Sequence, residues 1–118
     1  MARLEEIQKL QAMAADRCPT GARVVPVYSG RHLDVPEFAI VDEEDFERAS
    51  PYYWRQAKRH GKLHAWTNIP GEVYRCELGR FVMGVRRRHV TVRHLGDPLD
   101  CRKKMLQIQR VTASAHML

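Results

Sequence analysis

Turn-forming residues interrupt this chain at short intervals after residue 18, and their spacing limits it to short strands and short helices. Glycine, proline and serine end one apolar stretch after another, at Pro19-Thr20-Gly21, Ser29-Gly30, Pro51 and Gly61. The stretches between them are rich in valine and aromatic residues, which favour β-strands. We therefore expect strands at residues 23–28, 37–41, 52–56, 63–67, 73–78 and 89–92.

Other segments have helical features. The first is predicted as an amphipathic helix over residues 2–16, where apolar residues recur at helical spacing: Leu4, Ile7, Leu10 and Ala14. Asp42 can cap a short second helix whose acidic first turn the helix dipole favours, and Pro51 closes it. Residues 100–107 are a third helix candidate, and residues 112–117 a final helical turn. The pattern predicts an α+β fold with a small antiparallel sheet and short helices.

The 118 residues are predicted to form a helical arm over residues 1–20 and a single domain over residues 21–118. No apolar run approaches the ~20 residues of a membrane span, and the acidic Glu5 and Glu6 do not suit a signal peptide. We therefore expect a cytoplasmic protein with no membrane partner. Three distant cysteines favour reduced thiols over a disulfide framework or a zinc ribbon: Cys18, Cys76 and Cys101.

The net charge of +6 is distributed unevenly along the chain. Residues 34–47 hold seven acidic residues and no Lys or Arg. Residues 75–110 hold ten basic residues against the three acids Glu77, Asp97 and Asp100. This separation of charge indicates a face that binds a polyanion.

One stretch near the C-terminus has the order of a nuclease motif: Val92-Arg93-His94-Leu95-Gly96-Asp97-Pro98-Leu99-Asp100-Cys101-Arg102. It resembles the Asp-His, short turn and Leu-Asp-Asn-Arg elements of the HNH homing-endonuclease-like proteins that phages mostly carry. A second set of segments resembles the N-terminal half of that family: Phe38–Arg48, Tyr53-Trp54, Lys62–Ala65 and Arg80–Gly84. Together the resemblance covers about residues 24–118, and it implies a ββα-metal-like, HNH-type remnant at the C-terminal end.

Three departures from the family pattern concern its catalytic centre. The family has Leu-His-Arg where this chain has Leu78-Gly79-Arg80, and its metal-binding Asp is replaced by Arg93. A guanidinium carries a fixed positive charge and offers no lone pair to a cation. The family's middle Asn falls on Met105, or on Gln107 if two residues are inserted, and the second register places His116 on the family's last metal ligand.

The resemblance implies a role for His94 as the base that activates water, if the protein is active. In that case the metal would be Mg²⁺, with His116 as a remaining ligand; otherwise no cofactor is expected. A purely structural His94 at a strand-to-turn corner is the alternative. Asp97 and Asp100 are expected to make turn and helix-cap hydrogen bonds rather than to restore metal binding.

Basic side chains are the remaining candidate site residues. In the family's N-terminal half a strand face enters the major groove, which implies base contacts by Arg55 and Arg75. Cross-strand pairing of these arginines with Glu72 or Glu77 is the alternative. We expect phosphate contacts from a further set: Arg86, Arg87, Arg88, Arg93, Lys103 and Lys104. Three aromatic residues are expected in the core rather than against bases: Trp54, Trp66 and Tyr74.

These features predict a DNA-binding HNH-endonuclease-like protein of phage or mobile-element type, with an impaired catalytic centre and double-stranded DNA as its partner. Two alternatives remain open. The first is an active metal-dependent nicking endonuclease that uses His94 and His116. The second is an inhibitor in which the degenerate scaffold binds a host nuclease or defence protein, and to which the acidic residues 37–47 and the N-terminal helix would be suited.

Overall fold

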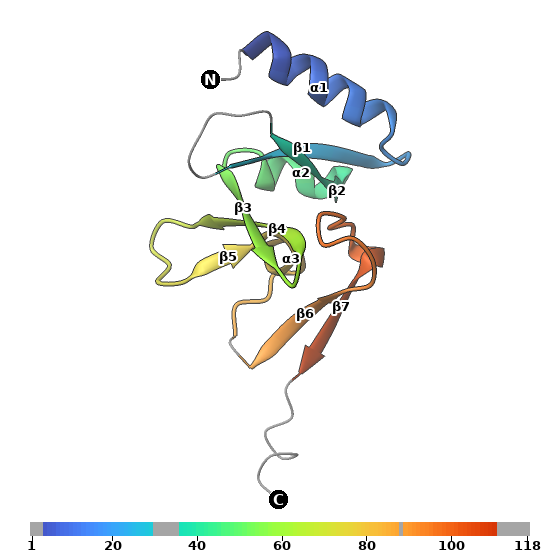
Figure 1. Cartoon of the computed structure of the whole chain (residues 1–118). Helices are drawn as coiled ribbons and strands as arrows, with labels where there is room; N and C mark the ends of the chain where they lie inside the picture. The colour runs from blue at the N-terminus through green and yellow to red at the C-terminus, as the bar shows by residue number, and fades with distance from the viewer. Residues whose placement is uncertain (1–3, 30–35, 88, 111–118) are drawn as a thin grey trace, which may run out of the picture.

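The computed structural model describes residues 4–29, 36–87 and 89–110, which form an α+β fold (Figure 1). The strands are β1 (Ala22–Tyr28), β2 (Glu37–Asp42), β3 (Trp54–Arg59), β4 (Lys62–Asn68), β5 (Arg75–Glu77), β6 (Val90–His94) and β7 (Leu106–Arg110). The helices are α1 (Leu4–Asp16), α2 (Glu43–Ala49) and α3 (Leu78–Met83), with one 3-10 turn, η1 (Lys103–Met105).

Five strands form a mixed sheet in the order β2-β1-β3-β4-β5, and β6 and β7 form a separate antiparallel pair. Strand β1 is antiparallel to β2 but parallel to β3, through the pairs Val27↔Trp54 and Tyr28↔Arg55. Helix α2 joins β2 to β3 and so carries the chain across β1. The predicted α+β class is confirmed, whereas the prediction of a purely antiparallel sheet is wrong because of this crossover.

The hairpin of β3 and β4 closes through a two-residue turn. His60 and Gly61 both adopt positive φ angles, of 51° and 77°, between the paired residues Arg59 and Lys62. Such a turn matches the right-handed twist of the two strands, and glycine tolerates the second position without strain. The turn fixes the register of the hairpin and therefore which side chains share its outer face.

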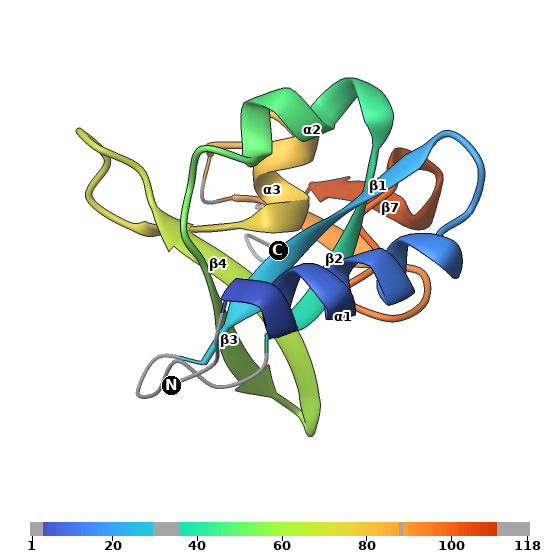
Figure 2. The same cartoon turned by 90° about the horizontal axis from the view of Figure 1, so that it is seen from above.

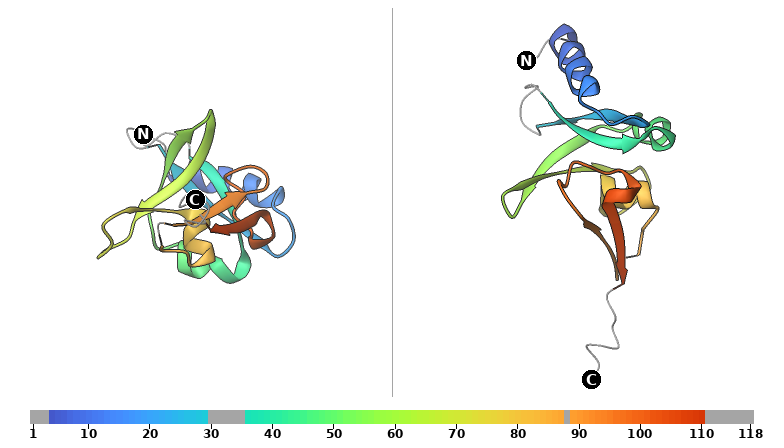
Figure 3. Two further views of the ribbon diagram at one scale, coloured as in Figure 1. Left: turned by 90° about the horizontal axis from the view of Figure 1, so that it is seen from below. Right: turned by 90° about the vertical axis from the view of Figure 1, so that its right-hand side faces the viewer.

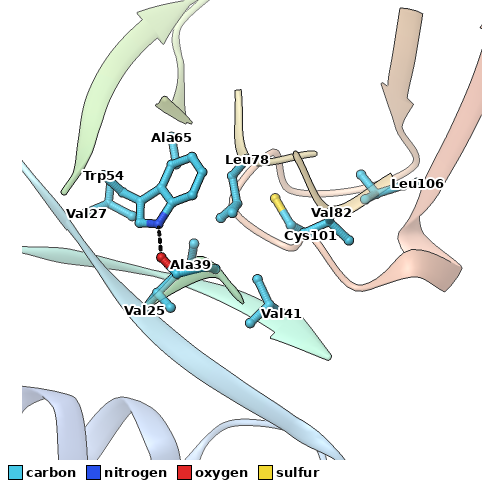
Figure 4. Close-up of a cluster of buried hydrophobic side chains, with 11 residues drawn as sticks. Val25, Val27, Ala39, Val41, Trp54, Ala65, Leu78, Val82, Cys101 and Leu106 are labelled. Carbon is cyan, nitrogen blue, oxygen red and sulfur yellow. Dashed lines mark hydrogen bonds between the residues drawn. The ribbon is translucent and has the colours of Figure 1, made fainter. Parts of the chain in front are cut away.

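The core lies between the sheet, α2, α3 and the β6–β7 pair (Figure 4). Trp54 is its largest fully buried side chain, and its indole N–H donates a 2.9 Å hydrogen bond to the carbonyl of Ala49 at the end of α2. This bond satisfies the one polar atom of the indole ring. The same core cluster contains apolar side chains from both sheets, from α3 and from the segment before η1: Val25, Val27, Ala65, Leu78, Val82, Cys101 and Leu106.

The segment predicted as a helix over residues 100–107 forms no α-helix. The N–H of Ile40 donates to the carbonyl of Leu99 at 2.8 Å, and the N–H of Cys101 donates to the carbonyl of Ile40 at 2.7 Å. The segment then makes the 3-10 turn η1 and enters β7. The helix prediction is wrong because β2 satisfies the backbone groups that a helix would have paired internally.

Asp42 precedes α2 as predicted, but its carboxylate makes no cap hydrogen bond to that helix. Its Oδ2 instead accepts a 2.9 Å hydrogen bond from the backbone N–H of Lys103. The side chain thus stabilises the turn before β7. The acidic first turn of α2 is present as predicted, at Glu43, Glu44 and Asp45.

The predicted turn at residues 112–117 lies outside the described residues, as does the position after β7 where a ββα arrangement would place its helix. Of the helices that the structure describes, none is long and apolar enough to cross a membrane.

Helix α1 lies across β1, on the opposite side of the sheet from the β6–β7 pair (Figures 2 and 3). Three residues of its apolar stripe, Ile7, Leu10 and Ala14, are half-buried. Val24 of β1 is only 5% exposed although it is not part of the main core cluster. The helix therefore shields a strand of its own domain, which agrees with the packing expected from an amphipathic pattern.

Replacing Leu10 by Ala should lower the free energy of unfolding by about 1 kcal/mol, because a half-buried leucine loses part of its apolar contact with β1. The melting temperature should fall by roughly 4 °C. Met13→Ala on the same helix is the matched control, since Met13 is 48% exposed and its loss should change stability by less than about 0.5 kcal/mol. An unchanged melting temperature in Leu10→Ala, together with lost self-association, would show that the stripe serves another chain.

Candidate nucleic-acid interface and histidine cluster

The outer face of β3, β4 and β5 presents a tryptophan between two arginines. Arg55 is the cross-strand partner of Trp66, and Arg75 is the partner of Asn68, two residues further along β4. The guanidinium carbon of Arg75 lies 4.3 Å from the centroid of the Trp66 ring, and that of Arg55 lies 5.7 Å from it. The indole ring holds both cations over the sheet by cation–π attraction.

Among the described residues, three cations of this face form no ion pair with a carboxylate: Arg55, Lys62 and Arg75. The acids that could have paired with Arg55 and Arg75 have other partners. Glu77 accepts from Arg59 at 2.6 Å, and Glu72 accepts from Arg86. The cross-strand pairing considered for Arg55 and Arg75 therefore does not form.

Two adjoining hollows continue this face towards the loop after α3. A groove of about 400 Å³ has Arg59, His64, Trp66 and Glu77 in its lining, and a hollow of about 310 Å³ has Glu72 and Arg86. Three residues line both: Tyr74, Arg75 and Arg80. The structure thus brings Arg86 close to the arginines of the sheet, although the two regions are separate in the sequence.

The three aromatic residues expected in the core differ in their surroundings. Trp54 is buried, as predicted. Trp66 is half-buried on the outer face beneath the two arginines, outside the core cluster, and Tyr74 is 59% exposed, so the prediction of a core position is wrong for both. Strand alternation places Trp66 on the face opposite the buried Ala65, because successive side chains point to opposite sides of a sheet.

The remaining residues predicted to contact phosphates differ in their surroundings. Arg87, Arg93 and Lys104 are exposed, whereas Lys103 lies 2.6 Å from Glu44 and 3.4 Å from Asp45. Lys103 therefore already neutralises acids of α2. Arg88 lies outside the described residues.

His94 ends β6 and points back towards the sheet rather than into solvent. Its ring meets the ring of His64 edge to face, with 5.5 Å between the centroids. Burial lowers the pKa of His94 below its ordinary value, and the neighbouring His64 lowers it further. Burial also lowers the pKa of His64. Both rings are therefore held in the neutral form at neutral pH, with one lone pair each.

The described residues around His94 do not fit the family's Mg²⁺ centre. Arg93 is exposed, Asp97 accepts a 2.9 Å hydrogen bond from the N–H of Leu99, and both oxygens of Asp100 accept from Arg102, at 2.8 and 2.6 Å. Although burial alone would raise the pKa of Asp100, the hydrogen bonds from Arg102 outweigh it and lower that pKa. His116 lies outside the described residues.

The carboxylate that does approach His94 is Glu77. His64, Glu77 and His94 each offer a ligand atom, and these atoms lie within 4.8 Å of one another. Sequence reasoning singled out His94 alone. Residues 64, 77 and 94 do not match the spacing of any known motif. Strand alternation at His64 and the register between β4 and β5 together place His64 beside Glu77, but a single sequence does not reveal that register.

Comparison of the chain with protein-family models, with curated proteins and with solved structures found no match.

Gly79 lies directly beneath the His94 ring. A Cβ at this position would lie 3.2 Å from Cε1 and 3.3 Å from Nε2 of His94, and 3.4 Å from Cδ2 of Leu106. We therefore expect Gly79→Ala to destabilise the protein by about 1 kcal/mol, because crowding outweighs the gain in helix propensity.

The control for Gly79→Ala is the same substitution in a His94→Ala background, where the space is open and the added methyl group should be neutral or stabilising. Urea denaturation of the four proteins gives the coupling energy between the two positions. Equal effects in both backgrounds would contradict the close packing of His94 on Gly79.

Proposed function

We propose that this protein binds double-stranded DNA through the outer face of β3, β4 and β5, as an HNH-endonuclease-like protein of phage or mobile-element type whose catalytic centre is impaired. The observation that carries the proposal is the pair of arginines, Arg55 and Arg75, held on either side of Trp66 with no acidic partner in the part of the chain that the structure describes. A guanidinium in such a position is free to form two parallel hydrogen bonds to guanine or to a phosphate.

The shape of the face supports the same function. A pair of antiparallel strands is narrow enough to enter the major groove of B-form DNA. On the outer face of the β3–β4 hairpin, Arg55 and Lys62 form no ion pair with any described residue. The adjoining hollow with Arg86 extends the basic surface beyond the sheet. The net charge of +6 adds a long-range attraction to a polyanion.

The surroundings of His94 support the impaired catalytic centre. A base must reach its water, and the metal must meet the scissile phosphate. Here the His94 ring packs on His64 and Gly79, and the acids of its own hairpin already have partners. The proposed role is therefore binding without efficient hydrolysis.

Binding to a duplex should weaken with salt, with a log–log slope of roughly −4 to −5 if four to six basic side chains contact phosphates. The double variant Arg55→Ala with Arg75→Ala should lose affinity about 10- to 100-fold, since each arginine contributes on the order of 1 kcal/mol or more. Fluorescence anisotropy at several salt concentrations measures both quantities.

A charge-matched control for this pair is Lys9→Ala with Arg17→Ala, which removes two exposed cations on or next to α1. Its affinity should fall far less, although its net charge is the same as that of the test variant. Equal losses of affinity in the two double variants would show that binding depends on net charge alone and not on the positions of Arg55 and Arg75. No binding even at low salt would reject the DNA-binding role and favour the inhibitor that binds a host protein.

The unaltered protein should not nick supercoiled plasmid efficiently in Mg²⁺ or Mn²⁺, because Arg93 stands where the resembled family has its metal-binding Asp. An agarose gel assay of the purified chain, run beside the His94→Ala variant, tests this. Robust nicking that requires the divalent ion and disappears in His94→Ala would establish the active nicking endonuclease instead.

A further inference from the structure

Three side chains that are distant in the sequence meet between the sheet and the β6–β7 pair. His64 comes from β4, Glu77 from the end of β5 and His94 from the end of β6, and one ligand atom of each lies within 4.8 Å of the other two. We propose that His64, Glu77 and His94 form a site for a divalent transition metal of the Zn²⁺ type. This site does not depend on DNA binding.

The backbone holds the three residues in place. Glu77 is the cross-strand partner of Trp66, which puts it on the same face as His64 and one diagonal step away. His94 pairs with Leu106 of β7, and Leu106 is part of the core. In a tetrahedral Zn²⁺ site with bonds of about 2.1 Å, the ligand atoms lie roughly 3.4 Å apart. Small rotations of the three side chains would bring their ligand atoms from within 4.8 Å of one another to this separation.

Two buried nitrogen atoms in this cluster have no partner among the described residues. Nδ1 of His64 and Nδ1 of His94 are both inaccessible to solvent, and neither atom forms a hydrogen bond with a described residue. A buried polar atom without a partner is costly, and its presence in a folded protein calls for a physical reason. A metal ion bound between the rings would supply that reason.

The chemistry of the donor set selects the metal. Two imidazoles and one carboxylate suit Zn²⁺ and its neighbours Co²⁺ and Ni²⁺, whereas Mg²⁺ and Ca²⁺ prefer oxygen ligands throughout. Three protein ligands leave a fourth position for water or for an anionic oxygen. His64 and Glu77 also line the groove with Arg75 and Arg80, so an anion that enters the groove can reach that position.

The positive charge nearest to the cluster is that of Arg59. Its Nη1 lies 2.6 Å from Oε1 of Glu77, and its side chain is 53% exposed. This pair occupies one carboxylate oxygen and leaves Oε2 for the metal. Such an outer hydrogen bond orients a carboxylate ligand, in the way that partners beyond the ligands commonly do.

A second group of acids, Asp42, Glu44 and Asp45, is also close enough to hold a cation. Its cation is already present, because the amine of Lys103 lies 2.6 Å from Glu44 and 3.4 Å from Asp45. The histidine cluster differs in that its one ion pair among the described residues is between the exposed Arg59 and Glu77. The metal is therefore assigned to His64, Glu77 and His94.

The test uses the full chain without a histidine tag, stripped with a chelator and dialysed into reducing buffer. Calorimetry with Zn²⁺ should give one site per chain, and Co²⁺ should give the visible absorption of a tetrahedral ion. At 100-fold over the dissociation constant, Zn²⁺ should raise the melting temperature by roughly 10 °C. Glu77→Gln, which keeps the size and shape of the side chain, should weaken Zn²⁺ binding at least about 10-fold.

Two exposed histidines outside the cluster provide matched controls, His60→Ala and His89→Ala, and Cys76→Ser tests the thiol beside Glu77. Each control should bind Zn²⁺ like the unaltered chain. Ring-nitrogen NMR of the unaltered protein should show shifts at His64 and His94 on addition of Zn²⁺, and this readout needs no variant to fold. Absence of a one-to-one site, undiminished binding in Glu77→Gln, or shifts confined to other histidines would overturn the proposal.

Discussion

Two backbone hydrogen bonds between β2 and the segment after β6 determine how the two sheets meet. Ile40 donates to Leu99 and accepts from Cys101, and the Cys101 side chain is buried in the core beside them. The contact between Asp42 and the N–H of Lys103 extends this junction by one more hydrogen bond. Because the junction holds the β6–β7 pair against the rest of the fold, it also brings His94 within reach of His64 and Glu77.

The basic residues divide into those that build the fold and those that remain available. Arg80 donates to the carbonyls of Val90 and Arg87, so it ties the loop after α3 to the start of β6. Arg102 also has a structural partner, because it donates hydrogen bonds to both carboxylate oxygens of Asp100. Arg55 and Arg75 instead rest on an aromatic ring and form no ion pair with the acids of the described residues. Net charge alone does not distinguish these two groups, and only the second supports recognition of a polyanion.

The surroundings of His94 connect two features that the sequence shows separately. Gly79 has no side chain, and the His94 ring occupies the space above it. Strand alternation then turns Arg93 outwards, where it is exposed, while His94 turns towards His64. The motif suggests His94 as a general base, but in this geometry the His94 ring is better placed to be a metal ligand. The proposed metal site and the proposed loss of efficient cleavage therefore have a common structural origin.

The sequence by itself determined the elements whose cause is local. The spacing of Leu10 and Ala14 predicted α1, the acidic turn after Asp42 predicted α2, and the glycine turn at Gly61 predicted the β3–β4 hairpin. The α+β class follows from these. The separation of acidic and basic regions was equally visible without coordinates.

Only the tertiary structure decided the features that depend on contacts between distant segments. The parallel pairing of β1 with β3, and the docking of residues 99–101 on β2 in place of a helix, satisfy backbone groups across long stretches of chain. The grouping of His64, Glu77 and His94 arises in the same way, since each comes from a different strand. Local propensity carries no information about which strands become neighbours, because register and pairing are set by the burial of side chains over the whole fold.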